Sequence, residues 1–571
     1  MLCTLLLLFL QAQSGAISAG RGTIVGHVVM DGGNAPVAHV HVEFAKAGGQ
    51  LQDYRTAVTA GDGAFAFTGL PAGTYRVYAE RDGYLRTEHG QRTGSASGIP
   101  IVVSDAQDES DVLITILPLG VIAGRVVDGS GNPVRHVWVR ALQPSYFYGH
   151  RNLSMTAYTE SNDLGEYRIF GLSPGRYFVS AVKRERPHME GDSYVVPVIP
   201  SNENHNQTEI RTSIEKVLEA GDVDPAVFDQ DIPVPTYYPG VTDAAYATSI
   251  DVRPGLEVTG IDLTTTSLPA VRVRGTVVNG ITGQRAQAVS INLIPRGRSV
   301  STSDQPSPRA IVKDGSFDIA GVPSGSYDLL AQDTNGAGLY ARTNVDVAKQ
   351  DLANISVVLR PGITITGQVT IDDGREIATA PGVTRFFAQL NDAQGNGGGH
   401  SVSIKPDGTF AILNVRNGDY TFRLFPPEAS ATAYVKAARL GATDALNGIH
   451  IDGDAEKRLD VVVALNSGNV DALVLDDKDH PVPGVSVAAV PAPPYRKRTD
   501  LYHVTATDAM GHAHFEGLAP GTYKLFAADG VGRNAWQDPD AIAEIDSRGE
   551  PLQVGENGKY SVTLKLIFAN R

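Results

Sequence analysis

The sequence predicts an all-β protein of five tandem antiparallel β-sandwich domains, immunoglobulin-like or transthyretin-like, with one helical insertion in the second domain. Three observations predict it. A glycine–tyrosine turn motif recurs along the chain, a β-rich run precedes each copy, and an alternating apolar run closes each unit. The 61 glycines and 33 prolines among 571 residues add many turns and therefore many short elements.

The turn motif has four clear copies and a degenerate one. They read GLPAGTY (69–75), GLSPGRY (171–177), GVPSGSY (321–327), NVRNGDY (414–420, degenerate) and GLAPGTY (517–523). Proline presets one turn angle, glycine supplies a positive φ, and tyrosine enters the next strand. We expect each tyrosine to pack its ring and return its hydroxyl to a nearby backbone group, as a structural residue. The repeated pairs are Gly73 and Tyr75, Gly175 and Tyr177, Gly325 and Tyr327, Gly418 and Tyr420, and Gly521 and Tyr523.

Strand-like runs surround each motif. A turn leads into a strand at GDGAFAF (61–67), DLGEYRIF (163–170), DGSFDI (314–319), DGTFAI (407–412) and AMGHAHF (509–515). Each unit opens with a β-rich run, in order IVGHVV, IAGRVV, VRGTVV, ITGQVT and, without the glycine, VDALVL. About seven short strands per 100 residues favour an antiparallel sandwich.

The spacing of the motif sets the domain ranges. The five tyrosines are 102, 150, 93 and 103 residues apart, so the unit is a domain of about 100 residues. We predict domains at 20–118, 119–268, 269–361, 362–467 (degenerate) and 468–571. The second carries an insertion, 183–238, in which Ile210, Ile214, Val217 and Leu218 have the spacing of an amphipathic helix.

The beginning of the chain predicts export. Residues Leu2 to Leu10 form an apolar run, followed by small and polar residues that suit cleavage between Ser14 and Gly20. We therefore expect residues 1–19 to be a signal peptide and the mature protein to be extracytoplasmic, whether periplasmic, at the cell surface or secreted. The one cysteine, Cys3, lies in this segment, so no disulfide is expected in the mature chain.

Composition makes some partners improbable. The net charge is −15 and charged residues are 19% of the chain, which disfavours a nucleic-acid partner. No later segment has the roughly 18 uninterrupted apolar residues of a transmembrane helix. The expectation is a mature chain without a membrane span, and its oligomeric state stays open.

Catalytic and metal motifs are weak. No histidine is followed three residues later by glutamate, and the pairs His39 with His41 and His512 with His514 offer two ligands each, which do not make a metal site. GLSPG formally matches a nucleophile elbow at Ser173, but the repeat makes this a turn residue. DGSGN (128–132) and DGDAE (452–456) lack the six or more ligands of a calcium loop. We expect no metal, no cofactor and no catalysis.

The order of motifs in Val25 to Tyr84 resembles the carboxypeptidase regulatory-like domain. That family is a transthyretin-like sandwich related to Cna B-type surface repeats and to the carbohydrate-binding-like fold, and the resemblance extends along the chain, weakly in the fourth unit. The resemblance implies that the ligand is a carbohydrate. It also implies a regulatory-type module that is not joined to a carboxypeptidase domain. Cna B-type domains often crosslink a first-strand lysine to an asparagine. The opening runs here have no lysine at the relevant places, where His27, Arg125, Arg272, Thr276 and Gln368 stand, so such bonds are not expected.

The second unit carries the candidate binding residues. In HVWVRAL, Val137 and Val139 should face the core, which leaves His136, Trp138 and Arg140 on the outer face near Tyr146 and Tyr148. Aromatic rings beside polar groups suit stacking on sugars. The alternative is that the 183–238 insertion folds over Trp138 and buries it.

Three functions remain open. The first is an exported, non-catalytic binding or adhesion protein, with polysaccharide or cell-envelope glycan as its ligand. The second is a structural spacer or envelope protein that binds a protein partner. The third is a hydrolase, or an accessory of one, with carboxylates in the insertion: Glu209, Glu215, Glu219, Asp222 and Asp224.

Overall fold

The computed structural model describes residues 22–568 apart from 33, 47–53, 92–97, 105–107, 148–149, 184–230, 297–300, 303–307, 313, 337, 375–385, 394–398, 426–432, 454–455, 530 and 532–534. The expected signal peptide, the expected helix at 210–218, the carboxylates at 209–224 and Tyr148 lie outside the described residues.

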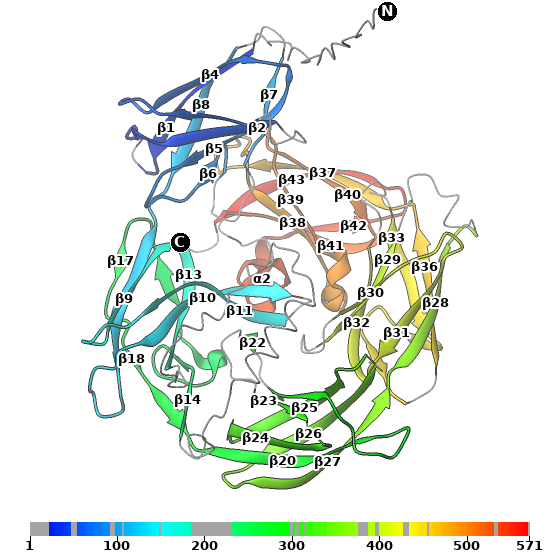
Figure 1. The fold of residues 1–571 in the computed structure, drawn as a ribbon. Coiled ribbons are helices and arrows are strands. Elements are labelled where there is room, and N and C mark those ends of the chain that lie inside the picture. The colour runs from blue at the N-terminus through cyan, green and yellow to red at the C-terminus, as the bar shows by residue number, and fades with distance from the viewer. Residues whose placement is uncertain are drawn as a thin grey trace, which may run out of the picture.

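The described chain is all-β apart from short helical turns, as the sequence predicts. Five hydrophobic clusters each collect buried side chains from within one predicted domain range. Figure 1 shows the sandwiches following one another along an arc, with the last beside the second. The boundaries between domains stay predictions. The first to fifth domains below are the five predicted ranges.

The first two domains hold the strands β1 to β19. In the first domain they are β1 (Gly22–Met30), β2 (His41–Lys46), β3 (Arg55–Val58), β4 (Ala64–Leu70), β5 (Gly73–Glu80), β6 (Thr87–Glu88), β7 (Ile101–Val103) and β8 (Asp108–Ile116). In the second they are β9 (Gly120–Val127), β10 (Val137–Phe147), β11 (His150–Glu160), β12 (Glu166–Leu172), β13 (Gly175–Lys183), β14 (Ile232–Val234), β15 (Thr236–Tyr237), β16 (Ile250–Val252), β17 (Glu257–Val258), β18 (Leu263–Thr264) and β19 (Thr266–Leu268), with the 3-10 turn η3 (Ala244–Tyr246).

The third and fourth domains repeat the pattern. The third has β20 (Ala270–Asn279), β21 (Val289–Pro295), β22 (Ser301–Thr302), β23 (Arg309–Val312), β24 (Ser316–Pro323), β25 (Gly325–Asp333), β26 (Leu339–Val347) and β27 (Leu352–Pro361). The fourth has β28 (Ile363–Ile371), β29 (Phe387–Asp392), β30 (Gly399–Ser403), β31 (Thr409–Val415), β32 (Gly418–Phe425), β33 (Tyr434–Leu440), β34 (Thr443–Asp444), β35 (Ile449–Ile451) and β36 (Lys457–Ala464).

The fifth domain adds helical elements to its strands. Its strands are β37 (Gly468–Leu475), β38 (Ser486–Pro491), β39 (His503–Ala506), β40 (His512–Leu518), β41 (Gly521–Asp529), β42 (Glu550–Val554) and β43 (Lys559–Phe568). Its helical elements are η5 (Tyr495–Lys497), η6 (Thr499–Leu501), η7 (Ala535–Gln537), α2 (Pro539–Ile545) and η8 (Asp546–Arg548).

One strand pair departs from the antiparallel expectation. The opening strand β1 runs antiparallel to β4, the strand of the Asp-Gly-x-Phe type. It runs parallel to β8, the closing strand. The same parallel pairing joins β20 to β27, β28 to β36 and β37 to β43. In the third domain β26 pairs with β27, which connects both halves of the sandwich into one seven-stranded sheet. The other neighbours in these sheets are mainly antiparallel.

The glycine of the opening run makes room for a neighbouring ring and a neighbouring carbonyl. A methyl group built on Gly275 would lie 2.2 Å from the carbonyl oxygen of Ile355 and 2.6 Å from Cζ of Phe317. Gly26 and Gly124 meet a carbonyl oxygen of the closing segment in the same way, each at 2.1 Å. The opening run is therefore glycine-centred because two strands and an aromatic ring converge on it.

We predict that Gly275→Ala weakens the third domain by about 1 to 3 kcal/mol, because overpacking a filled position forces its neighbours to move. Hydrogen-exchange mass spectrometry on the full chain should show faster exchange in peptides from 270–361. Gly129→Ala is the control, since a methyl group there meets nothing within 4 Å. Equal exchange in the two variants would contradict the packing explanation.

The repeated tyrosines make one recurring contact. The hydroxyl of Tyr75 donates to the carbonyl oxygen of Pro71 at 2.7 Å, four residues earlier in the chain. The same bond recurs at Tyr177, Tyr327 and Tyr523, at 2.8, 2.8 and 2.9 Å. All five tyrosines of the motif, Tyr420 included, are buried. Burial raises the pKa of Tyr177 and of Tyr420 to about 12, which keeps both hydroxyls protonated at neutral pH.

Tyr327→Phe should lower the stability of the third domain by about 1 kcal/mol, because the buried carbonyl of Pro323 loses its donor. Exchange rates of 316–333 in the full chain measure this. Tyr246→Phe is a matched control because Tyr246 is 74% exposed. A loss of stability in the control equal to that of Tyr327→Phe would argue against the hydrogen bond as the cause.

The helix α2 of the fifth domain was not predicted. The side chain of Asp538 caps it by accepting from the backbone NH of Asp540 at 3.0 Å, and Pro539 takes the first helical position. The Asp-Pro pair was the sequence signal for this start. Trp536, Ile542 and Ile545 pack with residues of β38 and β41 that face away from the sandwich core: Ala488, Val490, Phe526 and Ala528.

Polar contacts join successive domains along the arc. The linker before β9 bonds to the first domain, with the backbone NH of Leu119 donating to the carbonyl of Gly83 at 2.9 Å. Arg342 of the third domain lies 3.5 Å from Asp392 of the fourth, and Lys436 of the fourth lies 3.5 Å from Glu556 of the fifth. These contacts connect the first domain to the second, the third to the fourth and the fourth to the fifth.

Candidate binding face of the second domain

Strand β10 alternates as the sequence predicts. Val137, Val139 and Ala141 are buried in the core, and Trp138 and Arg140 point to the other face of the sheet. The neighbouring strand β11 pairs Trp138 with Glu160 and Arg140 with Tyr158. The outer face of this strand pair therefore carries two aromatic rings, an arginine and a carboxylate.

The two rings stack on each other. The ring centroids of Trp138 and Tyr158 are 5.0 Å apart and their planes differ by 11°. Nε1 of Trp138 donates to Oε1 of Glu160 at 2.8 Å, and the guanidinium carbon of Arg140 lies 5.8 Å from the centre of the Trp138 ring. Tyr158 is 51% exposed, so about half of its surface is accessible to solvent.

His136 lies at the edge of this stack. Its backbone adopts a left-handed conformation with φ of 57°, and its Nδ1 is 3.5 Å from Oε2 of Glu160. The Glu160 carboxylate thus lies between the indole NH and the imidazole. His136, Trp138, Arg140, Tyr158 and Glu160 together make the aromatic face, the name used below.

Tyr146 does not lie beside Trp138, contrary to the sequence expectation. It shares the outer side of β10, but eight residues at about 3.3 Å each place it roughly 26 Å away. Its side chain is buried and its hydroxyl donates to Oδ2 of Asp538 in the fifth domain. The residue that does lie beside Trp138 is Tyr158, which the sequence analysis did not single out. The alternation of side chains along its own strand, next to β10, was the signal that could have found it. Tyr148 and most of the insertion expected to cover Trp138 lie outside the described residues.

A shallow hollow of about 740 Å³ borders the aromatic face at Glu160. Its charged lining is paired: Arg125 bonds to Glu166 at 3.0 Å, and Arg168, also in the lining, bonds to Glu257 at 3.1 Å. Because these cations already contact carboxylates, the hollow offers mixed polar groups rather than a strongly charged pocket.

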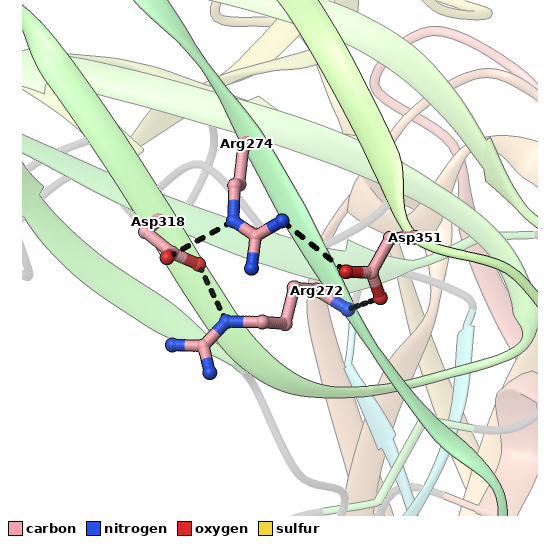
Figure 2. A network of polar contacts seen from close by, with 4 residues as sticks. All are labelled: Arg272, Arg274, Asp318 and Asp351. Carbon is pink, nitrogen blue, oxygen red and sulfur yellow. Dashed lines mark hydrogen bonds and ion pairs between the residues drawn. The ribbon is translucent and has the colours of Figure 1, made fainter. Parts of the chain in front are cut away.

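The third domain carries a separate charged network, shown in Figure 2. Nε of Arg272 and Nε of Arg274 donate to the two oxygens of Asp318 at 3.2 and 3.1 Å. Asp351 accepts from Nη1 of Arg274 at 3.2 Å and from the backbone NH of Arg272 at 2.9 Å. The positive charges of the two arginines equal the negative charges of the two aspartates. The network joins β24, β20 and the turn before β27, and it leaves no excess charge for a ligand.

The residues that formally matched metal motifs have structural contacts. Asp471 accepts from His512 at 2.7 Å and lies 3.8 Å from Nδ1 of His514; the bond to Asp471 raises the pKa of His512. Asp128 accepts the backbone NH groups of Ser130 and Asn132, both at 2.9 Å, as a turn residue does. Across the described part of the chain, no three or more histidine, cysteine, aspartate or glutamate side chains are grouped to hold a metal ion.

Ser173 belongs to a turn of the repeat. Its carbonyl oxygen accepts the hydroxyl of Tyr177, and Gly171 just before it has a φ of 74°. The corresponding carbonyls in sister domains belong to Pro71, Pro323 and Ala519, which have no nucleophilic side chain. The serine is thus one of several residues that fill the same turn.

The fold and the aromatic face define the class of protein: a tandem β-sandwich protein with a partly exposed aromatic face. Residues 23–108 match the family model of the carboxypeptidase regulatory-like domain, which confirms the resemblance in the first domain. No curated protein sequence matches the chain. No helix among the described residues is long and apolar enough to cross a membrane.

The solved structures that match this chain have low identity to it and low TM-scores. A Streptococcal ancillary pilin is 12% identical, covers 60% of this chain and 99% of its own, and has a TM-score of 0.21. A pilus protein from Streptococcus pneumoniae is 10% identical over 97% of this chain and 100% of its own, with a TM-score of 0.14. Two B repeat units of the collagen-binding protein of Staphylococcus aureus are 11% identical over 78% and 99%, with a TM-score of 0.13.

Proposed function

We propose that the protein is an exported, non-catalytic binding or adhesion protein whose second domain binds carbohydrate, either a polysaccharide or a cell-envelope glycan, on the aromatic face. The observation that supports this most is the Trp138–Tyr158 stack, whose tyrosine is half exposed. An exposed aromatic ring can stack against the apolar face of a sugar, and nearby polar groups can bond to its hydroxyls.

The neighbours of the stack suit hydroxyl recognition. Glu160 supplies acceptor oxygens and His136 a ring nitrogen, each partly accessible at the edge of the stack. The hollow beyond Glu160 extends the polar surface, so a ligand longer than one sugar unit would meet both. This surface binds without needing a nucleophile, a metal ion or a cofactor.

A glycan panel tests the binding proposal by tryptophan fluorescence of the full chain. Trp138 and Trp536 are the two tryptophans, and Trp536 is 1% exposed, so a ligand on the aromatic face should change the emission of Trp138. Because Trp138→Ala lacks the reporting tryptophan, isothermal titration calorimetry measures binding by the variants. We expect Trp138→Ala to abolish binding and Tyr158→Ala to weaken it at least tenfold, because the stack is lost.

Tyr246→Ala is the control for that panel, since this exposed tyrosine lies in the same domain and outside the aromatic face. It should bind as the unmodified chain does. If no glycan in a broad panel binds, or if Trp138→Ala binds with unchanged affinity, the carbohydrate proposal is wrong. A protein partner captured through the same face would then favour the structural spacer.

Export rests on the apolar run from Leu2 to Leu10 and the small residues after it. Expression in a bacterial host should yield a mature protein whose amino terminus lies between residues 15 and 21, measured by intact mass and terminal sequencing. Leu6→Arg should block this processing because it interrupts the apolar run. An uncleaved protein retained in the cytoplasm would contradict export.

A further inference from the structure

Strands β10 and β11 extend beyond the sandwich core of the second domain. Each has eleven residues, whereas the corresponding β2 and β3 of the first domain have six and four. Side chains of β10 enter the core cluster up to Ala141, and the paired strands then continue from Leu142 opposite Met155 to Phe147 opposite His150. We call residues 142–147 and 150–155 the arm.

The arm contacts two other parts of the chain. Strand β22 of the third domain pairs parallel to it, with Asn152 opposite Ser301 and Leu153 opposite Thr302. The side chain of Tyr146 reaches the fifth domain, where η7 also lies against β10. Figure 1 shows α2 inside the arc, beside the ends of β10 and β11.

The part of the fifth domain that meets the arm is the strap, residues 535–548. It consists of η7, α2 and η8 and lies across the outer side of β38 and β41. Its carboxyl end is fixed within the fifth domain, because Asp546 contacts Lys524 at 2.5 Å and Arg496 at 2.6 Å. These two cations also lower the pKa of the Asp546 carboxyl, so it stays ionised.

Asp538 fixes the amino end of the strap. One of its carboxylate oxygens bonds within the fifth domain and the other bonds to the second domain. Oδ1 caps helix α2 by accepting from the NH of Asp540, while Oδ2 accepts the hydroxyl of Tyr146 from the arm. Burial and the bond to Asp538 raise the pKa of Tyr146, so the phenol remains a donor. One side chain thus joins the start of the helix to the contact between distant domains.

We propose that the arm is a latch for the strap: docking of Asp538 on Tyr146 holds the fifth domain against the second and keeps Trp536 covered. When the latch is released, the amino end of the strap separates from the arm and the arc opens. The carboxyl end keeps the strap attached through Asp546. The apolar outer side of β41, with Phe526 6.0 Å from the Trp536 ring, then becomes accessible at that end.

The test reads the exposure of Trp536 in a full chain that carries Trp138→Phe, so that Trp536 is the remaining tryptophan. Two variants remove the latch in different ways. Tyr146→Phe deletes the donor, and Asp538→Ser keeps a good helix cap but is too short to reach the arm. We expect acrylamide quenching of Trp536 to rise at least twofold in both, and the double variant to match the single ones because both remove one contact.

Tyr246→Phe serves as the control, since it removes an exposed hydroxyl of the second domain and leaves the bond between Tyr146 and Asp538 in place. Spin labels at Leu164→Cys and Met510→Cys, both at exposed positions, with Cys3→Ser, should report a longer distance between the second and fifth domains in Tyr146→Phe. Unchanged quenching or an unchanged distance in Tyr146→Phe overturns the latch. A rise in Asp538→Ser alone would overturn it too, because the strap would then depend on its cap and not on the arm.

Discussion

The opening strand of a sandwich pairs with two partners, the strand of the Asp-Gly-x-Phe type on one side and the closing strand on the other, and the rest of the domain is built around this contact. In the first three domains its central glycine lets a carbonyl of the closing segment approach closer than a Cβ atom would allow. In the first, third and fourth domains the same glycine lets an aromatic ring such as Phe317 lie against it. Because the closing strand runs parallel to the opening one, the chain enters and leaves a domain at opposite ends. The last strand of each domain and the first of the next are then separated by only one to three residues.

These short connections explain why the array has a defined course. A linker of so few residues has little freedom, and the contacts of Arg342 with Asp392 and of Lys436 with Glu556 restrict it further. The domains therefore follow an arc that returns the fifth domain to the second (Figure 1). Sandwiches in an extended row would have favoured the alternative function, a structural spacer. In the arc, the arm of the second domain instead contacts the fifth domain of the same chain.

Much of the second domain was predictable because its signals are local. Alternation along β10 placed Val137 and Val139 inside and Trp138 outside, and the turn motif placed the ring of Tyr177 in the core. The partners of Trp138 were not predictable in the same way. Tyr158 and Glu160 come from the neighbouring strand, and their positions depend on the register of β10 with β11, which includes a bulge. Tyr146 depends on a residue almost four hundred positions away.

The sequence alone determined the all-β class, the recurring sandwich, the inward side of β10 and the structural place of the repeated tyrosines. Those features follow from periods and turns that span a few residues, so no distant partner is needed to recognise them. Only the tertiary structure decided the parallel pairing of opening and closing strands, the stack on Tyr158 and the contact of Asp538 with the arm. Each of these joins segments far apart in the chain, and the geometry that brings them together is set by packing between strands and between domains.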